Sequence, residues 1–109
     1  MINITIHKTK NKFDGFVIEG HSGYSESGSD IICASVSILS YTALNSMSIV
    51  AGISPDDISY DVKEETGFLK MKTIKNNEKT DVIYRNFLVG IELLLEDYSN
   101  YITLKFEEV

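Results

Sequence analysis

The stretch from Asp30 to Ala51 reads DIICASVSILSYTALNSMSIVA, and its apolar residues recur at steps of three and four positions. This spacing places them on one face of an α-helix. Ser29 or Asp30 is a suitable N-cap, and Gly52 followed by Pro55 provides the stop. We therefore predict a helix over about 30–51. Its buried face consists of Ile32, Val36, Leu39, Ala43, Met47 and Val50.

Two strands precede this helix. Ile2, Ile4 and Ile6 alternate with polar residues, which is typical of a half-buried strand. A polar turn at 9–12 separates them from a second run over 13–19 that ends at Glu19. We predict that the two runs pair as a hairpin.

The pattern of two strands and a helix is repeated after Pro55. Residues 58–62 and 68–74 read as two strands joined by a turn at 64–67, and 75–79 reads as a loop. A second helix begins at Asn77 or Thr80 as its cap, and Asn100 closes it. Its predicted buried face consists of Ile83, Phe87, Ile91, Leu94 and Tyr98. Residues 102–106 form a last strand, and Glu107 and Glu108 are expected in solvent.

The element order is thus ββαββαβ, which predicts an α+β fold with a mixed five-stranded sheet and two long helices. A chain of 109 residues accommodates one such core, so we expect a single domain over 1–109.

Composition excludes several functions. The net charge of -6 argues against a nucleic-acid clamp and against attachment to an anionic membrane. No stretch approaches the roughly 20 apolar residues of a membrane helix, and the alternating N-terminus is unlike a signal peptide. The single cysteine excludes an internal disulfide and a multi-thiolate zinc site. We expect a cytoplasmic protein with no metal and no cofactor.

That cysteine, Cys33, falls in the first turn of the predicted helix. Unpaired N–H groups and the helix dipole stabilise a thiolate there, and the thiolate is the reactive form. His21 lies twelve residues earlier, where the second strand meets a loop rich in glycine and serine over 20–29. If strand and helix pack side by side, His21 can take the thiol proton and return it to a leaving amine.

Each of these residues also has a plainer interpretation. A lone cysteine in a helix is most often a small buried apolar residue, and a lone histidine at a strand end is most often on the surface. Asp30 could be only an N-cap, and Tyr24 could only anchor the loop. Tyr41 could line a peptide groove or pack in the core, and His7 is expected on the surface.

Two segments resemble the ribosomal-processing cysteine protease family, Prp. They are Gly20-His21-Ser22-Gly23-Tyr24 and Gly28-Ser29-Asp30-Ile31-Ile32-Cys33-Ala34-Ser35-Val36-Ser37. They are similar to the family's Gly-His-x-x-Tyr and Gly-x-Asp-Ile-Val-Cys-Ala-x-Val-Ser. Ile32 replaces a frequent valine, and Ser22 stands where alanine is common.

The resemblance implies that Cys33 is the nucleophile and His21 the general base of a cysteine endopeptidase. It implies that Asp30 orients the imidazole or caps the helix. Ser22, Gly23, Tyr24, Gly28 and Ser29 would belong to a mobile loop that contacts substrate. Backbone N–H groups at the helix start, that of Cys33 included, would hold the oxyanion.

The expected substrate is the N-terminal extension of the large-subunit ribosomal protein L twenty-seven, and the enzyme is expected to be a homodimer. A non-catalytic module that docks a basic ribosomal segment during assembly is the alternative. Reactivity of the Cys33 thiol that depends on His21 would favour the enzyme, and an inert sulfur the binding module. Redox sensing is a third option, and it needs an intermolecular thiol partner because the chain has one cysteine.

Overall fold

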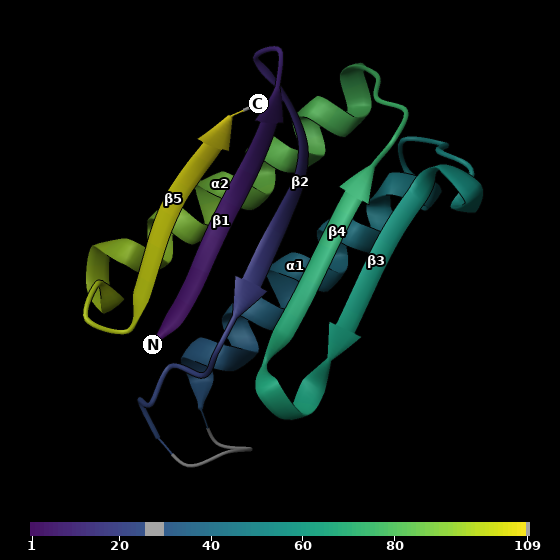
Figure 1. Cartoon of the computed structure of the whole chain (residues 1–109). Helices are drawn as coiled ribbons and strands as arrows, with labels where there is room; N and C mark the ends of the chain where they lie inside the picture. The colour runs from purple at the N-terminus through teal and green to yellow at the C-terminus, as the bar shows by residue number, and fades with distance from the viewer. Residues whose placement is uncertain (26–29, 109) are drawn as a thin grey trace.

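The structure is a computed structural model that describes residues 1–25 and 30–108. Five strands form one sheet in the order β3-β4-β2-β1-β5, and two helices cover one of its faces (Figure 1). The predicted α+β fold and the order ββαββαβ are confirmed. The elements are β1 (Ile2–Thr9), β2 (Lys12–Glu19), α1 (Ile31–Ile49), β3 (Ile58–Lys63), β4 (Phe68–Thr73), α2 (Glu78–Tyr98) and β5 (Ile102–Glu108).

The sheet is mixed because one pair of strands is parallel. β1 pairs with β2 in an antiparallel hairpin, whose tight turn has positive φ angles of 52° at Lys10 and 65° at Asn11. β3 and β4 form the second predicted hairpin, and β4 pairs antiparallel to β2. β5 lies parallel to β1 at the opposite edge. The two predicted hairpins are therefore joined by β2 and β4 in the middle of the sheet.

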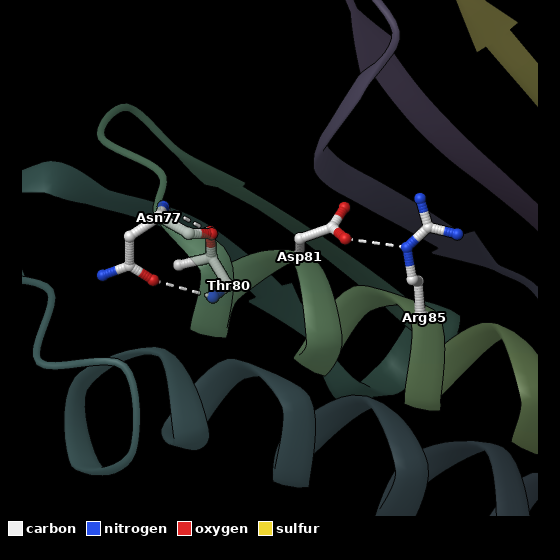
Figure 2. Close-up of polar contacts among 4 residues, drawn as sticks. All are labelled: Asn77, Thr80, Asp81 and Arg85. Carbon is white, nitrogen blue, oxygen red and sulfur yellow. Dashed lines mark hydrogen bonds and ion pairs between the residues drawn. The ribbon is translucent and has the colours of Figure 1, made fainter.

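Several predicted boundaries are shifted. α1 ends at Ile49 and α2 at Tyr98, so Ala51 and Asn100 lie beyond the helices. β5 does not stop before the final glutamates, because Glu107 and Glu108 continue its pairing with β1. The loop predicted over 75–79 ends earlier, because α2 begins at Glu78. The side chain of Asn77 accepts from the N–H of Thr80, and the Thr80 hydroxyl accepts from the N–H of Asn77 (Figure 2). This reciprocal capping box fixes the helix start one residue after Asn77.

The buried face of α1 agrees with the predicted pattern over most of its length. Ile32, Val36, Ala43 and Met47 are buried, and Ser40 joins them by donating its hydroxyl to the carbonyl of Val36 at 2.8 Å. Val50 departs from the pattern and is 54% exposed, because it is the C-cap residue beyond the last helical turn.

The core lies between the sheet and the helix layer. Phe16 of β2 is fully buried, and its ring stacks on that of Phe87 of α2 with centroids 4.1 Å apart. Ile4 of β1 and Ile91 of α2 are also fully buried. This packing holds α2 behind the middle of the sheet.

The expectation that no segment is apolar enough to cross a membrane is wrong for helix α1. By length and composition alone its 19 residues meet that criterion. Core helices of soluble proteins meet it as well, and the buried stripe of α1 belongs to the core described above. The criterion is therefore weak evidence of a membrane span.

Three segments meet at one end of the molecule. They are the end of β2, the first turn of α1 and the turn between β3 and β4, all at the lower end of the sheet in Figure 1. The last of these is a short 3₁₀ turn, Glu64–Thr66, which is followed by Gly67. The candidate functional residues lie on these three segments.

Candidate active site

Cys33 occupies the first turn of α1, where the backbone N–H groups have no partner within the helix. Asp30 caps this turn: its Oδ1 accepts the N–H groups of Ile32 and Cys33, each at 3.0 Å. The Cys33 side chain is half-buried and free of any disulfide. The helix start therefore presents one partly accessible thiol beside a buried carboxylate.

Ser22 joins the segment after β2 to this helix start. Its N–H donates to Sγ of Cys33 at 3.4 Å, which stabilises negative charge on the sulfur. Its hydroxyl donates to Oδ2 of Asp30 and accepts the N–H of Tyr24 at 3.0 Å. The side chain is 4% exposed, so it is a buried link between two elements.

The hydrogen bonds around Asp30 also determine its ionisation. Burial disfavours the charged carboxylate, but donation from the Ser22 hydroxyl and from the N–H groups of Cys33, Ser25 and Ile32 outweighs it and lowers the pKa of Asp30 below its ordinary value of 3.8. Both carboxylate oxygens are engaged within the cap. Among the contacts of the described residues, none joins Asp30 to His21.

His21 lies on the other side of the same site. Its ring is exposed, and Nε2 is 3.1 Å from the carbonyl oxygen of Glu65 in the β3–β4 turn. A pocket of about 290 Å³ is lined by both His21 and Cys33. Tyr41 also lines this pocket, while Val36 and Leu69 contribute apolar wall.

The other predicted loop residues have different surroundings. Tyr24 contacts the rings of Tyr98 and Tyr101 edge-on, with centroids 6.0 and 5.3 Å away, so it rests against the end of α2. Gly23 is exposed and has a φ of 74°. Gly28 and Ser29 lie outside the described residues.

The N–H of Cys33, which we predicted as an oxyanion donor, is engaged within the helix cap, and its role toward substrate stays a prediction. This N–H is already donated to Oδ1 of Asp30, and the N–H of Ala34 is donated to the carbonyl of Asp30 at 3.1 Å. Neither group is free for a substrate oxygen while the cap is intact.

Within residues 1–25 and 30–108, no group of three histidine, cysteine or acidic side chains lies close enough together to hold a metal ion. His7 lies on the polar side of β1, opposite Gly15 and Glu107 on the neighbouring strands.

Two residues of the site could not be found from the sequence. Glu65 contributes its main-chain carbonyl, which leaves no sequence signal. Gly67 was readable only as part of a turn, and nothing in its context pointed to His21. An ideal Cβ at Gly67 would lie 2.3 Å from the carbonyl oxygen of Gly20 and 3.2 Å from Cε1 of His21.

A thiol at a helix start and an imidazole in the same pocket are the parts of a thiol-dependent hydrolase. The comparison with known sequences agrees with this class. Residues 1–103 match the family described as cysteine protease Prp, and the chain belongs to that family.

Named relatives of similar length support the assignment. The ribosomal processing cysteine protease Prp of Staphylococcus aureus is 26% identical over 97% of both chains. The Bacillus subtilis protein of the same name is 26% identical over 92% of both chains.

Solved structures share the fold. The crystal structure of SMU.848 from Streptococcus mutans has a TM-score of 0.82 at 27% identity, with 100% of this chain and 99% of that chain covered. The Prp protease of S. aureus in complex with a covalently linked product peptide has a TM-score of 0.85 at 23% identity, with 98% and 100% covered. The fold is thus that of Prp proteases over the whole chain.

Proposed function

We propose that this protein is a cysteine endopeptidase in which Cys33 is the nucleophile and His21 the general base. The proposed substrate is the N-terminal extension of ribosomal protein L twenty-seven, removed in the cytoplasm during ribosome assembly. The observation that carries the proposal is that His21 and Cys33, on different elements, line one pocket. The relatives named as ribosomal processing proteases support the substrate class.

The mechanism proceeds through an acyl-enzyme. His21 accepts the Cys33 thiol proton, and the thiolate attacks the carbonyl carbon of the scissile bond. The imidazolium then gives its proton to the departing amine, and water hydrolyses the thioester by the reverse transfer. The N–H of Ser22, 3.4 Å from Sγ, stabilises the sulfur while it carries negative charge.

The pocket is suited to an extended peptide with apolar side chains. Its lining combines apolar side chains, such as Val36 and Leu69, with polar groups at Ser37 and Ser40. A crystal structure of the S. aureus protease contains a substrate peptide, which supports a peptide as the occupant here. The net charge of -6 suits recognition of the tail of a basic ribosomal protein.

The test incubates the purified protein with the complete L twenty-seven protein of its host and detects the shortened product by mass spectrometry. We expect cleavage by the wild type and none by Cys33→Ala or His21→Ala. Ser48→Ala is the matched control, because this exposed serine of α1 does not line the pocket. Cleavage that persists undiminished in Cys33→Ala would refute the proposal. A bound but uncleaved substrate would favour the docking module instead.

A further inference from the structure

The imidazole of His21 has a fixed partner outside the Cys-His pair. Its Nε2 lies 3.1 Å from the carbonyl oxygen of Glu65, a residue 44 positions away in the chain. A carbonyl oxygen accepts hydrogen bonds and cannot donate them, so Nε2 must carry a proton in this contact. Nδ1 has no hydrogen-bond partner among residues 1–25 and 30–108. The ring is therefore held as the Nε2–H tautomer, with Nδ1 left to accept a proton.

The β3–β4 turn is shaped to make this contact. Its 3₁₀ turn ends at Gly67, which has a φ of 66° and donates its N–H to the carbonyl of Glu64 at 3.1 Å. Gly67 lies directly against the backbone of Gly20 and the ring of His21, where a Cβ would overlap the Gly20 carbonyl oxygen. Because that obstacle is main chain, it cannot move without moving the segment that carries His21. The absence of a side chain at Gly67 thus allows the turn to close on His21.

We propose that the turn Glu64–Gly67 is the positioning element of the His21 base, and that the Glu65 carbonyl takes the part played by a carboxylate or amide in other hydrolase triads. This inference rests on the proposed function of His21 and Cys33. When the Cys33 S–H bond breaks, the proton binds Nδ1 of His21 and the electron pair stays on sulfur. The Nε2–H group remains on the Glu65 carbonyl, and this bond strengthens because its donor is now charged.

The first test measures the tautomer directly in the intact wild-type protein. Long-range proton–nitrogen NMR correlations of the neutral His21 ring distinguish Nε2–H from Nδ1–H. We expect the Nε2–H form. A neutral Nδ1–H tautomer would overturn the inference. This measurement needs no substrate, so it can fail while the cleavage assay succeeds, and the reverse.

The second test compares two glycines in the same backbone conformation. Gly67→Ala and Gly52→Ala both place a side chain at positive φ, 66° and 70°, but a Cβ at Gly52 meets nothing within 4 Å. Displacement of His21 in Gly67→Ala should lower kcat by on the order of 100-fold, with a smaller change in KM. Gly52→Ala should keep kcat near that of the wild type.

The outcomes separate positioning from general destabilisation. The pH profile of kcat/KM and the ring tautomer should change in Gly67→Ala and stay unchanged in Gly52→Ala. Equal kcat in the two glycine variants would overturn the inference, and so would a rise in activity, which would mean that the turn restrains His21. If Gly67→Ala does not fold, the tautomer of the wild-type His21 ring still decides the inference.

Discussion

Asp30 shows how one side chain can organise a site without contacting the reacting groups' side chains directly. Its two oxygens accept from the first turn of α1 and from the Ser22 hydroxyl, so it fixes both the helix start and the segment after His21. The sequence left two roles open for it, cap and orienter of the imidazole. The contacts are those of a cap, and the imidazole has its hydrogen bond with the Glu65 carbonyl.

We therefore expect the substitutions of Asp30 to divide by capping ability. Asp30→Asn keeps an oxygen for the N–H groups of Ile32 and Cys33 and can donate its amide to Ser22, so it should retain most activity. Asp30→Ala should lower the free energy of unfolding by about 1–2 kcal/mol through loss of the cap. Urea unfolding and the cleavage assay measure both. Loss of activity in a stably folded Asp30→Asn would instead support the orienting role.

The contribution of Asp30 to folding stability depends on pH, and the sign of this dependence follows from the shift of its pKa. The pKa of Asp30 is lowered on folding, so its carboxylate contributes stability above its ordinary value of 3.8, and this contribution is lost as the pH falls through the folded-state pKa. Asp30→Asn has no proton to bind there. The stability difference between wild type and Asp30→Asn should therefore shrink on acidification in parallel urea titrations.

At the scale of elements, the cap at the start of α2 should contribute more to stability than the ion pair on the surface of the same helix. Asn77 caps the helix reciprocally with Thr80 (Figure 2). Its amide also donates to the carbonyl of Ala51 at 3.1 Å, just beyond the end of α1. One turn later, Asp81 and Arg85 form an exposed ion pair of 2.7 Å. Solvent screens that pair, whereas the cap joins two helices.

Asn77→Ala should accordingly cost about 2 kcal/mol of unfolding free energy, from the lost cap and the lost bond to Ala51. Arg85→Ala should cost less than about 1 kcal/mol, because exposed ion pairs are weak. Urea denaturation of both variants gives the comparison. An equal loss in the two would show that the bridge between the helices contributes little.

For the whole molecule, both helices lie on one face of the sheet (Figure 1). Several large apolar side chains of these two helices are exposed. Ile38 and Ile49 of α1 are 65% and 81% exposed, and Val89 of α2 is 54% exposed. Exposed apolar side chains can mark an interaction site when they gather into a patch. We propose that a second copy of the chain, which the family resemblance implies, covers these side chains.

We expect the protein to have twice its chain mass of 12.2 kDa in solution. Ile38→Lys should shift the equilibrium towards monomer because it places a charge in the apolar surface. Ser59→Lys, on the exposed edge strand β3, is the control and should leave the mass unchanged. Light scattering at several concentrations measures all three. A monomeric wild type at high concentration would rule out the homodimer.

Local sequence patterns accounted for most of the fold. Alternation at Ile2, Ile4 and Ile6 and the helical spacing from Ile32 to Met47 reflect burial of one face, so each element was readable from its own residues. The errors lie at the ends. β5 extends to Glu108 because β1 pairs with it along this length. Local sequence does not show which strand will be the pairing partner.

The candidate site was predictable only in part, for the same reason. The sequence pattern contains three informative side chains, His21, Cys33 and Asp30, and their residue types indicate what chemistry they can perform. The bond from the Ser22 N–H to sulfur and the contact from the Glu65 carbonyl to the imidazole use main-chain groups that every residue possesses. No residue type identifies such a group.

The sequence by itself determined the elements, their order and the side chains capable of nucleophilic chemistry. Only the tertiary structure decided that β5 lies parallel to β1. It also decided that the carboxylate of Asp30 accepts hydrogen bonds from the helix start and from Ser22, and that the turn at Gly67 lies against His21. The physical reason is the distance along the chain over which each interaction acts. Periodicity and capping act within a few residues, whereas these contacts join segments that only the packed sheet and helices bring together.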